Sequence, residues 1–177
     1  MTDHADKPSG QIELVAAERD QEPTVANLLE LFIHDFSEFH DVAVGSDGRF
    51  GYRDLPLYWS DPDRHPFLVQ MDGKLAGLVF VRLAQNASDN EMVWDMAEFF
   101  ILRGYRRRGI GAMAAQVVWN HFPGRWQVRV METNVAAQKF WARTISTFLG
   151  EVADPAHVER GSRRWQVFSF DSRQPGQ

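Results

Sequence analysis

Residues 97–112 constrain the fold more than any other stretch of this chain. They read Ala-Glu-Phe-Phe-Ile-Leu-Arg-Gly-Tyr-Arg-Arg-Arg-Gly-Ile-Gly-Ala, which is an apolar strand, a turn rich in Arg and Gly, and the start of a helix. A glycine turn between a strand and a helix exposes backbone N–H groups, and the helix N-terminus adds a positive dipole. The sequence therefore predicts a cradle for a phosphate-bearing ligand.

The first part of the chain predicts a strand and a helix before a long irregular segment. Alternating apolar residues at 12–16 indicate the strand. Apolar residues then recur on one helical face, which predicts a helix from Asp20, its expected cap, to Phe36. Periodicity weakens over residues 38–66, where we expect a loop and a short helix near residues 52–59. Such an aromatic-rich segment either belongs to a functional site or plugs one end of the core.

The middle of the chain predicts an antiparallel meander. Two β-rich runs, at 67–71 and 75–83, are joined by Asp72-Gly73, which is a strong hairpin signal. A third run at 91–102 follows a polar turn and is expected to pair with the second.

After the glycine turn, the pattern predicts a helix and then a strand at 126–131. A strand–helix–strand order makes a crossover, so the strands on either side of this helix should be parallel. The expected buried face of the helix comprises Ile110, Met113, Ala114, Val117, Val118 and His121.

The C-terminal part predicts a third helix and closing strands. Asn134 is placed to cap the helix, and Gly150 is placed to end it. A closing strand is expected at 165–170, and a short strand between 151 and 159 is weakened by Pro155. The expected fold class is a mixed α/β sheet, with an antiparallel front half and a βαβ unit behind it.

Length and composition predict one domain and exclude several kinds of site. The 177 residues suit a flexible lead-in at 1–9, a single domain at 10–171 and a flexible tail at 172–177. A net charge of −5 disfavours general binding of nucleic acid. The absence of cysteine excludes disulfides and thiolate sites and fits a cytoplasmic protein. No apolar run approaches the roughly 18 residues that a membrane span needs.

The pattern Arg106-x-x-Gly109-x-Gly111 fits the binding of a phosphate. Gly109 and Gly111 let the backbone approach an anion without a Cβ in the way, and Arg106, Arg107 and Arg108 are expected to add charge-assisted contacts. The nucleoside triphosphate loop is excluded because no Gly-Lys-Ser/Thr is present. The dinucleotide fingerprint requires three glycines near the first strand, and this turn follows the fourth.

Together with Asn134-x-x-Ala137-x-x-Phe140-Trp141, these motifs resemble the GNAT superfamily of acetyl-CoA-dependent N-acetyltransferases. The resemblance implies that the strand before the turn splays from its neighbour and pairs with the pantetheine arm of coenzyme A through Phe100, Ile101 and Leu102. It implies that Asn134 lines the same channel, with Phe140 and Trp141 beside it. The residues that it implies at the pyrophosphate are Arg106, Arg107, Arg108, Gly109, Ile110, Gly111 and Ala112.

Trp141 departs from the pattern of the family, which often has at this position a Tyr that protonates the leaving thiolate. An indole N–H is not usefully acidic. Either another group or water is then the acid, or no dedicated acid is needed. Phe140 and Trp141 are most simply core residues of the third helix, and Trp141 would also suit a wall of the thioester channel.

Glu98 is the first candidate for the base that deprotonates the amine. By alternation it shares a side of its strand with Met96, Phe100 and Leu102, so apolar neighbours should raise its pKa. The alternative is that Glu98 forms an ion pair with Arg82 or Arg129. Glu132 is the second candidate, although it precedes a helix and its charge also favours the helix dipole.

The acceptor site is expected around His34, Tyr52 and Tyr58. The region that follows the first helix shapes this site in the resembling family. The acidic chain and its aromatic segment permit a cationic, partly apolar amine without selecting it, so small-molecule and peptide amines both remain open. His34-Asp35 with His40 is too loose for a metal site, and we expect no metal.

The resemblance implies an N-acetyltransferase that moves an acetyl group from acetyl-CoA to a primary amine by direct attack in a ternary complex. The missing Tyr supports an alternative, a non-catalytic module that binds an acyl-CoA. Nucleic-acid binding through the Arg-rich turn is disfavoured by the net charge and the lack of a wider basic face. A homodimer is common in the resembling family, and the aromatic closing strand is a candidate interface.

Overall fold

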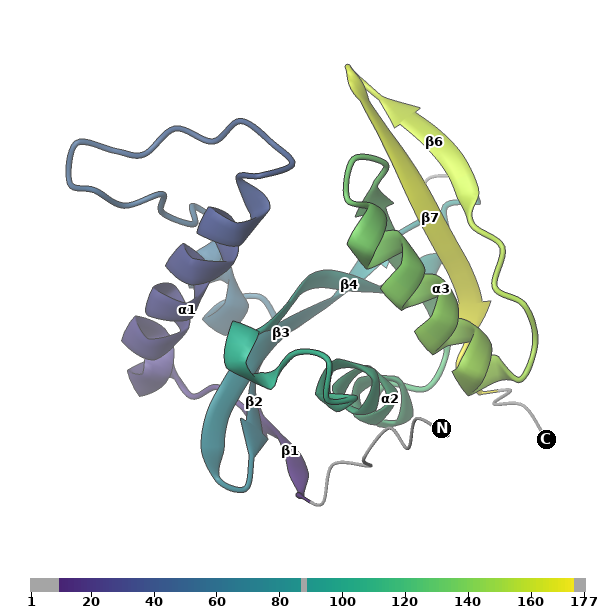
Figure 1. The fold of residues 1–177 in the computed structure, drawn as a ribbon, viewed down its shortest axis with the longest axis horizontal. Helices are drawn as coiled ribbons and strands as arrows, with labels where there is room; N and C mark the ends of the chain where they lie inside the picture. The colour runs from purple at the N-terminus through teal and green to yellow at the C-terminus, as the bar shows by residue number, and fades with distance from the viewer. Residues whose placement is uncertain (1–9, 87–88, 174–177) are drawn as a thin grey trace, which may run out of the picture.

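The computed structural model describes residues 10–86 and 89–173. All strands in these residues join one sheet in the order β1-β2-β3-β4-β5-β7-β6 (Figure 1). In chain order the elements are β1 (Ile12–Ala16), η1 (Arg19–Gln21), α1 (Glu22–Phe36), η2 (Leu55–Trp59), β2 (Arg64–Met71), β3 (Lys74–Gln85), β4 (Met92–Ile101), η3 (Arg103–Tyr105), α2 (Ile110–His121), β5 (Arg125–Met131), α3 (Val135–Leu149), β6 (Ala156–Arg160) and β7 (Arg163–Asp171).

The sheet separates two hydrophobic cores. On one face Leu29 of α1 and Tyr58 of η2 pack in the same cluster as Phe80 of β3. On the other face Trp119 of α2 and Trp141 of α3 form the larger cluster. In Figure 1, α1 and the loop after it lie at one side of the molecule and the β6–β7 hairpin lies at the other. The mixed α/β fold expected from the sequence is confirmed.

The start of α1 differs from the prediction. Asp20 lies inside the short 3₁₀ turn η1 and does not cap the helix, which begins at Glu22. The side chain of Gln21 accepts a hydrogen bond from the Glu18 N–H at 3.0 Å and closes this turn. Pro23 falls in the first turn of α1, where its missing N–H costs nothing.

The expected meander is present, with β2, β3 and β4 paired in antiparallel. Asp72 and Gly73 have φ angles of 51° and 71°, and a two-residue type I′ hairpin needs positive φ at both positions. Strand β2 begins at Arg64, earlier than predicted, and includes Pro66. The Pro66 carbonyl accepts the Ala17 N–H at 2.9 Å, so the proline adds a bond beyond the end of β1.

Strands β4 and β5 are parallel, as the crossover predicts, but they pair only at Trp94–Trp126 and Asp95–Gln127. Beyond Asp95 the two strands diverge. This splay leaves the second half of β4 without a strand partner on the β5 side. The resemblance implied this feature, and the structure confirms it.

The buried face of α2 is rotated from the predicted one. Ala115 and Trp119 are buried, whereas Val117 is 37% exposed and His121 is exposed. The reason is that α2 packs against α3 as well as against the sheet. The Trp119 ring lies 4.9 Å from Phe148 of α3, which draws this side of α2 into the core.

The C-terminal elements form largely as expected. Asn134 Oδ1 accepts the Ala137 N–H at 3.0 Å and caps α3, and Gly150 ends the helix with φ 73°. Strand β7 lies between β5 and β6, so the free edge on this side of the described sheet is β6 rather than the aromatic closing strand. Ser172, which the sequence placed in the tail, is buried and donates its N–H to the Gly124 carbonyl at 2.8 Å.

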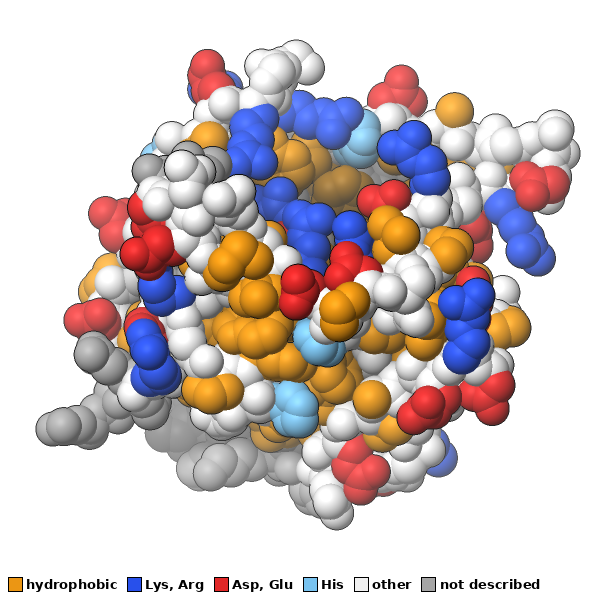
Figure 2. Space-filling model, turned by 180° about the vertical axis from the view of Figure 1, so that it is seen from behind, with side chains coloured by type: hydrophobic (Ala, Val, Ile, Leu, Met, Phe, Trp, Pro, Cys, Tyr) orange, Lys and Arg blue, Asp and Glu red, His pale blue; other side chains and the backbone are white. Residues whose placement is uncertain are grey.

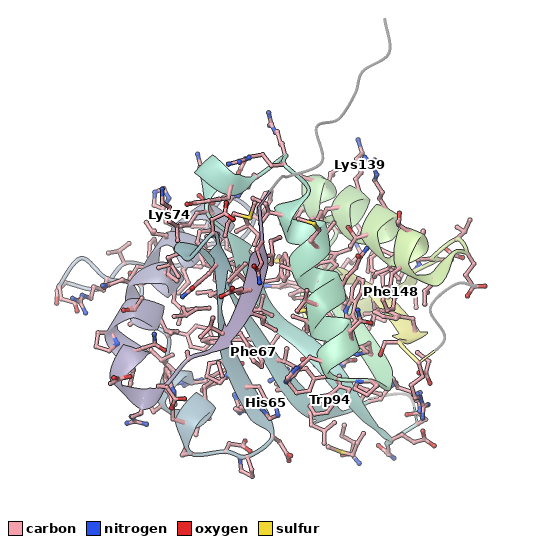
Figure 3. The ribbon with its side chains drawn as sticks, turned by 90° about the horizontal axis from the view of Figure 1, so that it is seen from below. His65, Phe67, Lys74, Trp94, Lys139 and Phe148 are labelled. Carbon is pink, nitrogen blue, oxygen red and sulfur yellow. The ribbon has the colours of Figure 1, made fainter. Side chains whose placement is uncertain are left out.

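An aromatic cluster closes one end of the sheet. Figure 3 shows His65, Phe67 and Trp94 gathered there. Phe122, at the end of α2, joins them at ring distances of 5.0 Å from His65 and 4.7 Å from Trp94. The predicted lead-in at 1–9 and the last residues, 174–177, lie outside the described parts of the chain. No helix in the described parts is long and apolar enough to cross a membrane.

Candidate active site

The open edge of β4 forms one wall of the candidate site. The Leu102 N–H donates to the Ala76 carbonyl of β3 at 2.8 Å. Backbone groups alternate in direction along a strand, so Leu102 and Phe100 direct theirs toward β3, and Phe99 and Ile101 direct theirs toward the gap. Of the three strand residues predicted at the coenzyme, Ile101 therefore presents its N–H to the gap.

The glycine turn forms the end of this wall. Gly109 has φ 76°, a left-handed conformation that glycine adopts without strain, and it immediately precedes α2. The first N–H bonded within the helix is that of Met113, which donates to the Gly109 carbonyl at 3.1 Å. The N–H groups of Ile110, Gly111 and Ala112 precede this bond in the first turn of α2, where backbone N–H groups lack a partner within the helix.

Gly111 has a packing role that the sequence did not reveal. A Cβ at this position would lie 3.3 Å from the Phe140 ring and 3.6 Å from the Ile101 side chain. The missing side chain therefore lets the start of α2 close on β4 and α3. The close approach that we expected toward a ligand is here an approach to the protein itself.

Arg106 is held by the protein, contrary to the expectation that all three arginines of the turn face a phosphate. Its guanidinium donates to Asp35 Oδ2 at 2.5 Å and to the Ile101 carbonyl at 2.7 Å, and it lies over the Phe100 ring. Arg103 donates to the same aspartate at 2.7 Å. These hydrogen bonds lower the pKa of Asp35, although burial opposes them. Arg107 and Arg108 are exposed, which leaves these two side chains free to reach a phosphate.

A β-bulge places Glu98. Phe80 pairs with Glu98 and Val81 pairs with Met96, so Ala97 is an extra residue in β4. The bulge breaks the alternation that placed Glu98 on the same side as Met96. Met96 belongs to the core beneath α2 and α3, whereas Glu98 shares the opposite face with Phe80.

Glu98 is hydrogen-bonded but has no ion-pair partner in the described residues. Tyr52 Oη donates to Glu98 Oε1 at 2.9 Å. Burial raises the pKa of Glu98 from 4.5 to about 7, and the Tyr52 hydrogen bond and the charge of Arg129 offset only part of this effect. A carboxylate with this pKa exchanges protons near neutral pH.

The ion pair with Arg82 or Arg129, which was the alternative for Glu98, is formed by Asp95 instead. Asp95 is fully buried, with 0% exposure. Arg82 donates to its carboxylate at 2.8 Å and Arg129 at 2.7 Å. The two arginines that were candidate partners of Glu98 are thus bound to another carboxylate.

The segment after α1 folds over the sheet and brings Tyr52 next to Glu98. The Glu30 carboxylate of α1 accepts the N–H groups of Phe50 and Gly51, both at 2.8 Å. Tyr52 then packs edge-on against Phe80 at 5.9 Å. Burial and the nearby Glu98 carboxylate raise the pKa of Tyr52 well above its ordinary value, so this phenol is a hydrogen-bond donor and a poor acid.

Two other predicted acceptor residues lie differently. Tyr58 is a core residue whose ring is tilted against the Phe80 ring at 3.9 Å, and its buried hydroxyl lies near Tyr52. Burial raises the pKa of Tyr58 to about 12, and the Glu98 carboxylate contributes. His34 is exposed on α1 and contacts Phe50 edge-on at 6.4 Å.

Glu132, which follows the end of β5, contacts two basic side chains. Its carboxylate lies 2.7 Å from His157 Nδ1 and 3.4 Å from Arg164 Nε. These contacts join the turn before α3 to the β6–β7 hairpin. The structure therefore gives Glu132 a structural partner set and does not bring it into contact with Glu98.

Trp141 is a core residue and the half-buried Phe140 packs against the core, and both lie behind the gap. Trp141 is 6% exposed and meets Phe99 of β4 edge-on at 4.9 Å. Phe140 stacks on the same ring at 5.9 Å. The indole is packed between Phe99 and Trp119 and offers no acid. No cluster of metal-binding side chains occurs in the part of the chain that the structure describes.

Sequence reasoning missed two parts of the site. The first is the pair of hydrogen bonds from Arg103 and Arg106 to Asp35. These arginines lie 68 and 71 positions after Asp35, so no local sequence pattern predicts the contacts. The buried Asp95 had a signal, because it is a lone carboxylate in an apolar strand with arginines on the predicted neighbouring strands.

Comparison with known proteins gives a match to a family model and matches to solved structures. A model of the acetyltransferase (GNAT) family matches residues 25–145. An acetyltransferase structure from Thermus thermophilus has a TM-score of 0.65 at 16% identity and covers 91% of this chain and 97% of that one. A spermidine N-acetyltransferase from Vibrio cholerae, solved with CoA and spermine, has a TM-score of 0.61 at 15% identity and covers 93% and 97%.

No curated protein sequence matches the chain. The structural neighbours are too distant in sequence to show more than the fold. The family model, however, spans the glycine turn, the splayed strands and most of α3 in one match. On this evidence the chain belongs to the acetyltransferase (GNAT) family.

Proposed function

We propose that this protein transfers an acetyl group from acetyl-CoA to a primary amine by direct attack in a ternary complex. The observation that carries the proposal is Glu98, whose pKa is raised to about 7 on the strand whose open edge ends at Ile101. Family membership supports the acetyl donor, and the position of Glu98 supports turnover rather than binding alone.

The residues present fit coenzyme A. The gap offers the backbone groups of Phe99 and the N–H of Ile101 to an extended amide-containing chain, whereas the Ile101 carbonyl already accepts Arg106. The N–H groups of Ile110, Gly111 and Ala112, with the exposed Arg107 and Arg108, suit a pyrophosphate. When bound, acetyl-CoA supplies an acetyl group activated as a thioester.

Glu98 acts as the base in this proposal. An amine is protonated at neutral pH and attacks only after it loses a proton, which Glu98 Oε2 is free to accept while Oε1 holds the Tyr52 hydroxyl. With a pKa of about 7, Glu98 is largely ionised at pH 8 and still basic enough to take the proton. Tyr52 keeps the carboxylate oriented.

The backbone N–H of Ile101 polarises the thioester carbonyl in this proposal. Its N–H points into the gap and is placed to donate a hydrogen bond to a carbonyl oxygen there. Trp141 is buried and donates no proton to the leaving sulfur, so water is the proton source that we assign to that step.

The second candidate is a module that binds acyl-CoA without turnover, and the buried Trp141 favours it. Thiol release from acetyl-CoA with a panel of primary amines separates the two candidates. We expect release with at least one class of amine. Binding of CoA without release for any amine would support the module.

The coenzyme site has its own test. Gly109→Ala places a side chain at a left-handed position and should weaken CoA binding about tenfold or more in calorimetry. Gly104→Ala is the matched control, because a Cβ there meets nothing within 4 Å. Equal affinity of the two variants for CoA would contradict the phosphate cradle.

A further inference from the structure

One face of the sheet is uncovered where β5, β7 and β6 pair. Arg129 pairs with Val167, Trp165 with Val158, and Arg163 with Arg160. Directly opposed residues, and residues two apart on a strand, point to the same face. These six side chains line a hollow of about 200 Å³ on the side opposite α3. Figure 2 shows basic side chains gathered around a hollow with apolar side chains at its floor.

The hollow carries more positive charge than its surroundings balance. Arg160 and Arg163 are directly opposed at the end of the β6–β7 hairpin, an arrangement that costs stability through repulsion. Neither forms an ion pair with a described residue. Arg129 shares the single carboxylate of Asp95 with Arg82. The chain is acidic overall, with net charge −5, so this basic concentration is local.

Arg129 connects the hollow to the face of β4 that carries the proposed base. Arg129 donates to Asp95, which precedes Glu98 by three residues on β4. The charge of Arg129 lowers the pKa of Glu98, so the two groups interact electrostatically. An acceptor with its amine at Glu98 and an anionic group directed along this face would meet Arg129 first. Val158, Trp165 and Val167 form a half-buried apolar floor beneath these arginines.

We propose that this hollow binds an anionic group of the acceptor, so that the amine acetylated by this protein also carries a carboxylate or a phosphate. The proposal rests on the proposed function and narrows its substrate class. Guanidinium groups bind both anions through paired, charge-assisted hydrogen bonds. An acceptor with an anionic group differs from the cationic, partly apolar amine that the acidic composition permitted.

Two matched pairs of amines test the proposal by calorimetry on CoA-saturated protein. Alanylalanine and alanylalanine amide differ in a carboxylate, and glucosamine 6-phosphate and glucosamine differ in a phosphate. We expect the anionic member of at least one pair to bind about tenfold tighter than its neutral partner, and the pair that responds identifies the anion.

The double variant Arg160→Gln/Arg163→Gln should remove this preference and leave the affinity of the neutral partner unchanged. It should fold, because both residues are exposed and their removal relieves a like-charge contact. Arg143→Gln, an exposed site on α3, is the control and should keep the preference. Equal binding within both pairs, or an equal loss for both members in the double variant, would overturn the inference. Thiol release from acetyl-CoA, measured separately, tests the proposed function itself.

Discussion

Asp95 and Glu98 stand three residues apart on β4 and have opposite surroundings. Asp95 is fully buried and binds two arginines. Glu98 has no ion-pair partner among the described residues and accepts a phenol hydrogen bond from Tyr52. The first is a fixed counter-ion, and the second has a pKa raised to about 7. Burial raises the pKa of a carboxylate, and an ion pair with a cation opposes that rise.

The bulge at Ala97 places Asp95 and Glu98 on the same face of β4. In a regular strand, residues three apart point to opposite faces of the sheet. The extra residue at Ala97 turns Glu98 to the face where Asp95 already meets Arg82 and Arg129. Asp95 thereby engages both arginines next to Glu98 and leaves Glu98 to interact with Tyr52 and, in our proposal, with the amine.

The largest effect is expected from Glu98→Gln. Removing the base should lower kcat/KM for acetyl transfer by about 10²- to 10⁴-fold at pH 8, because the amide accepts no proton. Calorimetry should show unchanged CoA affinity. Glu132→Gln is the matched control and should retain wild-type turnover, since Glu132 is bound to His157 and Arg164. A Glu98→Gln enzyme as fast as the wild type would remove Glu98 as the base.

Asp95→Asn should act on stability instead. It leaves Arg82 and Arg129 without their shared carboxylate, and because both guanidiniums keep some exposure to water we expect a loss of about 2 kcal/mol in the free energy of unfolding. Urea denaturation at pH 8 measures this loss. If the Asp95 variant is as stable as the wild type, the counter-ion role is wrong.

Glu98→Gln should shift stability in the opposite direction. The raised pKa means that the folded protein binds more protons than the unfolded chain between pH 4.5 and about 7, so Glu98 destabilises the fold increasingly as pH rises through that window. The full cost is present above pH 7. At pH 8 the variant should therefore be more stable than the wild type by about 1–3 kcal/mol, and at pH 4 this gain should vanish. A variant that is less stable at pH 8 would contradict the raised pKa.

The smallest effect is expected from Tyr52→Phe. The hydrogen bond from Tyr52 lowers the pKa of Glu98, so its loss should move the acid limb of the pH–rate profile upward by about 0.5 to 1 pH unit. Tyr58→Phe is a close control, because the hydrogen bond to Glu98 comes from Tyr52 and not from Tyr58. Identical profiles for the two variants would show that the Tyr52 contact does not tune Glu98.

Features that depend on a few neighbouring residues could be predicted from the sequence. The start of α2 after the glycine turn, the Asn134 cap and the Asp72-Gly73 hairpin all follow from local chemistry. Family resemblance added the splay of β4 from β5, which a periodic pattern does not contain.

Features that depend on pairing between distant segments could not be predicted. The bulge at Ala97 reverses the alternation that the sequence implied for Glu98, and it becomes visible only when β3 and β4 are in register. The clamp of Asp35 on Arg106 turns an expected ligand contact into a structural one. The hollow at Arg160 and Arg163 requires β6 and β7 to pair.

In our proposal, Glu98 is the group on β4 that exchanges a proton near neutral pH. Carbon-13 NMR titration of the side-chain carboxyl groups tests it without knowledge of the acceptor, and Glu98→Gln assigns the signal. We predict a midpoint near pH 7 for Glu98. A midpoint near the ordinary value of 4.5 would contradict the account.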